Sequence, residues 1–224
     1  MTHSKSLIIA IDGPSGAGKG TVSSTLAASL GYRHIDTGAM YRAVGWKANV
    51  GDIALDDERA VADLAERAQI VVEGGVVSID GQDVTRAIRT SEIDKVAAAV
   101  ARLPRVREIM VERQRALGDG GGVVMEGRDI GTVVFPAADV KIYLDASADE
   151  RARRRAGDTA HTGGQAGQEA VAASIAARDK ADTTRTVSPL TLAADAVYID
   201  TTSMPIDQVV DSVMRLVRQK LANY

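Results

Sequence analysis

The segment at residues 13–21 (GPSGAGKGT) constrains the fold of this chain more than any other feature, and it follows the apolar run at residues 7–11. An apolar strand that ends in glycines and then reaches a lysine at the start of a helix wraps backbone N–H groups around a polyphosphate. The glycines let the backbone turn without Cβ clashes, and the helix predicted from about residue 20 to residue 30 directs the positive end of its dipole at the phosphates. We therefore interpret the segment as a P-loop, since the strand before it and the helix after it disfavour an ordinary glycine-rich turn.

Lys19 is the lysine of the P-loop pattern, and we assign it a catalytic role because it supplies a mobile positive charge. Gly20 occupies the position that normally holds Ser or Thr, so the hydroxyl comes one residue later, at Thr21. Thr21 is therefore a candidate Mg²⁺ ligand. The residues predicted to hold the phosphates are Gly13, Pro14, Ser15, Gly16, Ala17, Gly18, Lys19, Gly20 and Thr21.

Length and composition indicate one α/β domain. The chain has 224 residues, enough to bury a substantial core, and it has no cysteine, which excludes disulfides and thiolate metal sites. Its three histidines lie far apart in the sequence, so a histidine-based metal site is not expected. A net charge of −3 and a single Trp and a single Phe argue against a nucleic-acid partner. The N-terminal stretch is too brief for a signal peptide and the apolar runs are too brief for a membrane span, so we expect a cytoplasmic monomer without a membrane partner.

Strand and helix patterns alternate along the chain. This alternation predicts a P-loop NTPase-like α/β fold, in which helices flank a parallel sheet on both faces. After the first strand, the β-rich runs of that sheet are expected at residues 32–36, 123–125, 140–144 and 196–200. The runs at residues 70–73 and 76–79 are too short for it. We expect them to form a small antiparallel insertion at about residues 65–92 on the acceptor side of a single domain that spans residues 1–224.

Each expected strand of the main sheet ends on an acidic residue. Ligands of parallel sheets lie outside the carboxyl ends of the strands, so these residues share an edge with the P-loop. Glu126 closes the buried run at residues 123–125, where a Mg²⁺-organising carboxylate is expected, directly or through water. For Asp145 and Asp200 we favour capping of the next helices. The acidic residues are Asp12, Asp36, Glu126, Asp145 and Asp200.

Residues 148–182 are interpreted as a mobile lid. The stretch at residues 157–167 combines low hydrophobicity with several glycines, which predicts a mobile loop. Arg154 and Arg155 stand just before that loop, where a closing lid would deliver them to a transferring phosphoryl group. We therefore favour a catalytic role for both over a place on a solvated helix face.

Six segments, in this order and spacing, resemble the bacterial cytidylate kinases, a family of P-loop nucleoside monophosphate kinases. They are GPSGAGKGT, DTGAMYR, LPRVRE, EGRDIGTVVFP, VKIYLDAS and RDKADTTRTVSPL. The resemblance implies in-line transfer of a phosphoryl group from Mg-ATP, held at the P-loop, to CMP and to dCMP. It assigns the acceptor phosphate to Arg42, Arg128 and Arg185, and Arg128 also has a catalytic role. The sugar is assigned to Arg178 and Asp182, and the cytosine to Arg107 and Asp129.

Elementary chemistry supports these roles. Transfer between two polyanions needs positioning and charge neutralisation rather than a general base, because the attacking oxygen is already anionic. Guanidinium groups suit phosphate oxygens because they bind them in a bidentate manner. Asp129 can accept from the N4 amino group of cytosine while Arg107 serves N3 and O2. Uracil would place a carbonyl oxygen against Asp129, which costs about 1 to 3 kcal/mol or more.

The chain departs from the family at one position of the base site. Members carry a base-contacting serine a few residues before LPRVRE, whereas this chain has Ala97, Ala98 and Ala99 in that region. Thr37, where many members have serine, keeps a hydroxyl and is included among the CMP-binding residues.

Other functions are compatible with parts of the sequence. A kinase acting on UMP, AMP or a non-nucleotide would carry the same loop, and its preferred acceptor would distinguish it from a kinase that acts on CMP. A regulatory GTPase would need an N-K-x-D segment, but the chain has no Asn-Lys pair, and its one D-x-x-G match, at residues 119–122, precedes a strand. An RNA-binding protein would use the arginines at residues 102–115 and 151–155, which near-neutral charge and scarce aromatic residues oppose.

Overall fold

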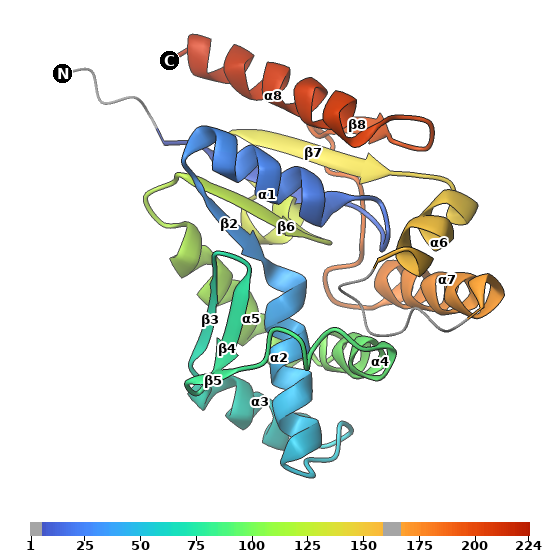
Figure 1. Cartoon of the computed structure of the whole chain (residues 1–224). Coiled ribbons are helices and arrows are strands. Elements are labelled where there is room, and N and C mark those ends of the chain that lie inside the picture. Colours follow the sequence, from blue (N-terminus) through green and yellow to red (C-terminus); the bar gives the residue numbers. More distant parts are fainter. Residues whose placement is uncertain (1–5, 159–166) are drawn as a thin grey trace.

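Residues 6–158 and 167–224 are described by the computed structural model, and within them five parallel strands form the central sheet (Figure 1). The strand order is β2-β6-β1-β7-β8, and every neighbouring pair runs parallel. This arrangement confirms the predicted parallel α/β architecture. The strands are β1 (Ile8–Asp12), β2 (Arg33–Asp36), β6 (Val123–Gly127), β7 (Val140–Asp145) and β8 (Val197–Asp200).

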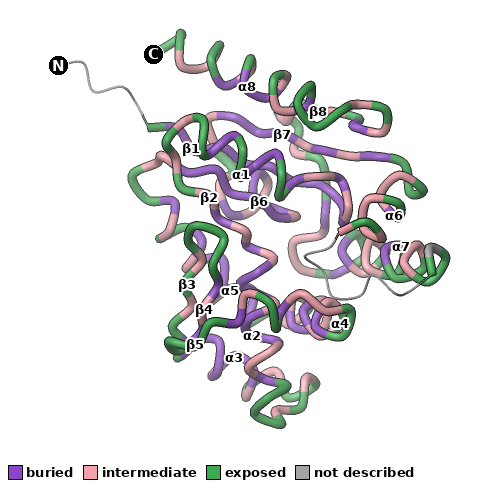
Figure 2. Tube along the Cα trace, in the orientation of Figure 1, coloured by how far each residue is buried: buried purple, intermediate pink, exposed green. Residues whose placement is uncertain are grey.

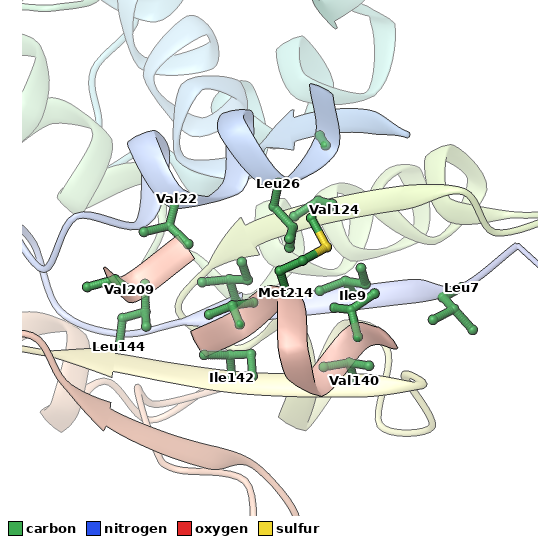
Figure 3. Packing of buried hydrophobic residues seen from close by; sticks show 14 of the residues in the cluster. Leu7, Ile9, Val22, Leu26, Val124, Val140, Ile142, Leu144, Val209 and Met214 are labelled. Carbon is green, nitrogen blue, oxygen red and sulfur yellow. The ribbon is translucent and has the colours of Figure 1, made fainter. Parts of the chain in front are cut away.

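Helices cover both faces of the sheet, so the central strands are buried along most of their length (Figure 2). Helices α1 (Lys19–Leu30) and α8 (Ile206–Ala222) cover one face. Figure 3 shows Leu26 of α1 and Met214 of α8 beside Val124 of β6, and Val22 of α1 beside Val209 of α8. Because side chains alternate along a strand, the neighbours of Ile9 face the other side. There they meet α5 (Pro104–Gly118) and η1 (Ile130–Val134), a single π-helical turn.

A second group of elements lies beside the sheet, on the side that the sequence analysis predicted to bind an acceptor (Figure 1). Helices α2 (Thr37–Val50), α3 (Glu58–Arg67) and α5 enclose a second apolar core, to which α4 (Ser91–Val100) contributes. The short strands β3 (Ile70–Glu73), β4 (Val76–Ile79) and β5 (Gln82–Asp83) form an antiparallel sheet that packs against α2. The predicted antiparallel insertion is therefore present.

Helices α6 (Ala148–Ala156) and α7 (Gln168–Thr184) lie beyond the arrowhead of β7, at the edge toward which the strands point (Figure 1). The two helices pack against each other, and α7 also contacts α4. Together they account for most of residues 148–182, for which a mobile lid stays a prediction. Most of the predicted mobile loop, residues 159–166, lies outside the described residues.

Two of the strand-end carboxylates do not cap helices as predicted. Asp145 accepts from the backbone N–H of Ala146 at 2.8 Å, and Asp200 accepts from that of Thr202 at 2.9 Å. Each carboxylate satisfies a backbone N–H one or two residues further along, because the next helices begin later and have Ser147 and Pro205 at their N-cap positions. Asp36 differs because α2 follows it at once, and it caps that helix through Ala39.

Candidate active site

A cavity of about 890 Å³ opens at the carboxyl edge of the sheet. Seven of the nine predicted phosphate-binding residues line it, from Ser15 to Thr21, whereas Gly13 and Pro14 lie behind the loop. The acceptor side contributes Arg42 of α2, the β6 end contributes Glu126 and Arg128, and α7 contributes Arg178. The structure therefore gathers around one space cationic groups that lie far apart in the sequence.

Glycines at defined positions allow the loop to curl. Gly13, Gly16 and Gly18 have φ values of 145°, 82° and 91°, which side chains rarely permit. A Cβ on Gly13 would lie 2.0 Å from the backbone oxygen of Leu144, so only glycine suits this contact with β7. Gly18 precedes α1 without a side-chain cap, which leaves the first N–H groups of that helix available to an anion.

Lys19 is buried, and its Nζ donates to the backbone oxygen of Pro14 at 2.7 Å. Burial, together with the nearby charge of Arg128, lowers the pKa of Lys19 to about 7, although Glu126 opposes the shift. A lysine in this state gains from a polyphosphate because the anion would restore its full charge. The side chain is therefore prepared for an anionic ligand.

Glu126 and Thr21 both line the cavity and offer oxygen ligands to a cation. The carboxylate lies against the start of α1: its oxygens are 3.5 and 3.9 Å from the position of a Cβ on Gly20. Within residues 6–158 and 167–224, no group of three His, Cys, Asp or Glu side chains could hold a metal. This donor set suits Mg²⁺, which binds one or two protein oxygens and takes its remaining ligands from phosphates and water.

His34 of β2 is a site residue that the sequence analysis placed in a strand without a role. Its Nε2 lies 2.8 Å from Glu126 Oε1, and it lines the same cavity. Burial disfavours the charged imidazole, but the hydrogen bond and charge of Glu126 outweigh this effect and raise the pKa of His34. A histidine at an exposed sheet edge has no sequence signature, so only the strand order reveals the pair.

Two of the arginines predicted to bind the acceptor nucleotide are held by carboxylates. Arg128 Nε donates to Asp182 at 2.7 Å, and Arg178 Nη1 donates to Asp94 at 2.9 Å. Burial, with the charges of Arg128 and Arg42, lowers the pKa of Arg178 to about 10. Its Nε has no hydrogen-bond partner among the described residues. Several neighbouring arginines, one of which has a buried N–H without a partner, are suited to bind a multiply charged anion.

The residues assigned to cytosine lie together behind this cluster. Arg107 of α5 donates to Asp129, and its guanidinium stands 5.6 Å from the ring centre of Tyr41. Arg185 Nη2 approaches the other oxygen of Asp129 at 3.5 Å. Arg107, Asp129 and Arg185 are all buried, and Arg107 Nε finds no partner in the described part of the chain. The structure thus joins the pair predicted to read the base, but none of these three residues lines the 890 Å³ cavity.

The two lid arginines take different partners. Arg154 donates to both the hydroxyl and the backbone oxygen of Thr201, at 2.9 and 2.7 Å, and lies over Gly18. Arg155 donates to Asp94 on α4. Both line the cavity, as does their neighbour Arg153, so α6 presents three cations to it.

Thr37 and Asp182 orient neighbours instead of lining the cavity. Thr37 is buried, and its hydroxyl donates to the backbone oxygen of Glu126 at 2.7 Å. Asp182 is buried and accepts from Arg128. Thr37 therefore holds the end of β6, and Asp182 holds the first residue after that strand.

Asp94 and Asp12 are further residues that the sequence analysis did not assign to the site. Asp94 accepts from Arg42, Arg155 and Arg178. Asp12 accepts from the backbone N–H groups of Ile130 and Gly131 at 2.8 and 2.7 Å. Burial raises the pKa of Asp12 to about 6, although these two hydrogen bonds oppose the shift. The position of Asp12 at the end of the first strand was a signal for a role at this edge.

Comparison with known proteins adds an independent finding. The family model described as cytidylate kinase matches residues 9–219. A cytidylate kinase of Solibacter usitatus (strain Ellin6076) is 46% identical, over 99% of this chain and 97% of its own length. A cytidylate kinase of Bacillus subtilis (strain 168) is 48% identical, over 96% of this chain and 98% of its own length.

Among solved structures, an uncharacterized protein from Eubacterium ventriosum ATCC 27560 shares the fold, with a TM-score of 0.50 at 11% identity. The alignment covers 95% of this chain and 98% of that one. No helix in the described ranges, 6–158 and 167–224, is both long and apolar enough to cross a membrane. Because the family model spans nearly the whole chain and the named relatives match it from end to end, the chain belongs to the cytidylate kinase family.

Proposed function

We propose that this protein transfers the γ-phosphoryl group of ATP to CMP, forming CDP and ADP, and that dCMP is a second acceptor. One observation carries the proposal: the P-loop with Lys19 and the arginines of the acceptor side line a single cavity. Membership in a family named for this activity supports it. A cytoplasmic location and a monomeric state remain predictions from the sequence.

In the proposed reaction an oxygen of the CMP phosphate attacks the γ-phosphorus of ATP. The bond from that phosphorus to the oxygen shared with the β-phosphate breaks in line, and ADP leaves with that electron pair. The attacking oxygen is already anionic, so no general base is required. The protein therefore has to align the two phosphates and neutralise their combined charge.

The cations of the cavity divide into two sets. The N-terminus of α1 and Lys19 would hold the ATP phosphates, with Arg154 of α6 above Gly18. Arg42, Arg128 and Arg178 would hold the acceptor, and Arg155 lies between the sets. A Mg²⁺ ion would be held by Thr21 and Glu126, directly or through water, and would supply charge neutralisation to the ATP phosphates.

Base selection is proposed to rest on Arg107 and Asp129. The two side chains pair with each other while Arg107 Nε stays without a partner among the described residues, and cytosine would replace part of this pairing with bonds to N4 and to N3 or O2. Uracil has no amino group for Asp129, and a buried carboxylate facing a carbonyl oxygen is unfavourable. CMP should therefore be preferred over UMP.

A coupled assay of ADP release tests the proposal. CMP, dCMP, UMP, AMP, GMP and dTMP are offered separately with ATP and Mg²⁺, next to a reaction without acceptor. Fast turnover with CMP and dCMP and little with the others is expected, and Lys19→Met should abolish it while the protein stays folded. Preference for another acceptor, ADP release without acceptor, or full turnover by Lys19→Met would contradict the proposal.

A further inference from the structure

Asp94 of α4 draws together arginines from three other helices. Its Oδ1 accepts from Arg42 Nε of α2 at 3.1 Å and from Arg178 Nη1 of α7 at 2.9 Å. Its Oδ2 accepts from Arg155 Nη2 of α6. The Asp94 side chain is 12% exposed, so these pairs are partly withdrawn from water and are stronger than surface pairs. One carboxylate therefore connects α2, α4, α6 and α7.

The partners of Asp94 belong to the site proposed above. Arg42 and Arg178 are assigned to the acceptor nucleotide, and Arg155 to the lid. All three line the 890 Å³ cavity, whereas Asp94 does not. Asp94 instead lines a second cavity, of about 540 Å³, between α4 and α7, and Arg155 and Arg178 line both. The carboxylate thus holds the arginines at the boundary of the two cavities.

Carboxylate and phosphate groups bind a guanidinium group in the same way. Both offer anionic oxygens to the planar fork of Arg, and both are bound through charge-assisted hydrogen bonds. A guanidinium that donates to Asp94 through one nitrogen has to give up or share that donor when a phosphate binds. The two anions would also repel each other across a shared arginine.

We propose that Asp94 competes with the acceptor phosphate for Arg42, for Arg155 and for Arg178, which the family resemblance assigned to the sugar, and that it thereby sets the affinity of the free enzyme for CMP. This inference rests on the proposed function of the same site. In the ligand-free protein Asp94 satisfies the arginines and ties α6 and α7 to α4. The phosphate of CMP takes over these donors, and the contact between α4 and the lid is released as it binds. The affinity for CMP is therefore lower than the same arginines would give without the carboxylate.

Three variants separate this role from a structural one. Asp94→Asn keeps the shape and an accepting oxygen but removes the charge, and Asp94→Ala removes both. Glu92→Gln is the matched control because Glu92 is an exposed acid in the same first turn of α4. Thermal unfolding of each variant shows whether it folds, and Asp94→Asn keeps the test available if Asp94→Ala does not.

The measurement is calorimetric binding of CMP and of cytidine, without ATP, to the full-length proteins. Cytidine carries the base and sugar but no phosphate, so it reports losses that come from a disturbed pocket. We expect Asp94→Asn to bind CMP about tenfold more tightly than wild type, with cytidine affinity and the KM for ATP unchanged. Glu92→Gln should match wild type in all three.

Several outcomes would overturn the inference. Weaker or unchanged CMP binding by Asp94→Asn would mean that Asp94 positions the arginines for the phosphate, or has no role in binding it. An equal gain for cytidine would place the effect outside the phosphate site. Failure of the proposed function looks different, because wild type itself would then neither bind nor phosphorylate CMP.

Discussion

His34 Nε2 lies 2.8 Å from Glu126 Oε1, and the two residues are 92 positions apart on adjacent strands β2 and β6. The imidazole fixes one oxygen of the carboxylate that we propose as a Mg²⁺ partner. The hydroxyl of Thr37 donates to the backbone oxygen of Glu126 and so fixes the backbone of that residue. The orientation of Glu126 is therefore set from two sides by groups that do not themselves bind the metal.

Replacing His34 should weaken Mg²⁺ use without changing the acceptor. We expect His34→Ala to raise the Mg²⁺ concentration for half-maximal activity by about tenfold, because partners that orient a metal ligand commonly contribute that much. Calorimetric titration of Mn²⁺ into the enzyme with a non-hydrolysable ATP analogue checks this independently of turnover. His34→Gln, which keeps a donor, should recover part of the loss. An unchanged metal requirement in His34→Ala would reject the role.

The pKa of Lys19 leads to a signed dependence of stability on pH. The folded protein binds the Lys19 proton only below about pH 7, whereas the unfolded chain keeps it up to about 10.5. Between these values the unfolded state holds more protons, so the Lys19 contribution makes the protein more stable as pH rises from 7 to 10. Denaturant unfolding across this range should show a flatter profile for Lys19→Met than for wild type. Parallel profiles would mean that burial does not shift this amine.

ATP binding should take up a proton for the same reason. Above pH 7 the free enzyme holds Lys19 largely neutral, and a polyphosphate favours its charged form. Calorimetry of ATP binding at pH 8, in buffers of different ionisation enthalpy, measures the number of protons taken up. A value near zero in wild type, or the same value in Lys19→Met, would be inconsistent with this mechanism.

Asp129→Asn should relax the choice between CMP and UMP. The amide offers uracil a donor that the carboxylate lacks, so the ratio of kcat/KM for the two acceptors should fall by about ten- to a hundredfold. Because Arg107 and Arg185 lose a buried partner, stability should fall by about 3 to 5 kcal/mol. The ratio of kcat/KM for CMP and UMP is therefore the readout, and the melting temperature is measured separately to report the loss of stability. A ratio that stays at the wild-type value would place base selection elsewhere.

Two P-loop glycines should respond differently to a side chain. A Cβ on Gly13 would lie 2.0 Å from a backbone oxygen, in a backbone conformation that favours glycine, so Gly13→Ala should not fold stably. The position of a Cβ on Gly20 is 3.5 Å from its nearest neighbour, an ordinary contact, so Gly20→Ser should fold with a melting temperature near wild type. Thermal unfolding of both decides the matter, and equal losses would refute the distinction.

The elements were predictable where local pattern and turn chemistry agree. The run before residue 13, the glycines of the loop and the proline that opens α5 each mark a boundary that the structure places within a residue or two. The turn η1 was not predicted, because five residues are too few for a periodic signal and the turn is held by Asp12, which lies 118 and 119 positions from its partners.

In the site, too, features with a local sequence pattern were predictable and long-range contacts were not. Arg42, Arg128 and Arg178, which line the cavity, were identified from motifs that stand at the carboxyl end of a strand or in a helix that packs there. Arg154 and Arg155 were chosen because they precede a predicted mobile loop, whereas Arg89 and Arg153, which also line the cavity, were not identified. Their carboxylate partners were harder to predict. Asp94 meets Arg155 and Arg178 across separations of 61 and 84 residues, through packing of α4 against α7 that no local pattern encodes.

Asp12 immediately precedes the P-loop, and its two oxygens accept from the backbone N–H groups of Ile130 and Gly131, which immediately follow Asp129, the residue that we propose reads the base. The P-loop and the segment that follows Asp129 are thus both held by the side chain of Asp12. Their spacing is fixed when the chain folds and does not have to be found anew in each catalytic cycle. Any movement of one segment away from the other would have to break two buried hydrogen bonds to one carboxylate.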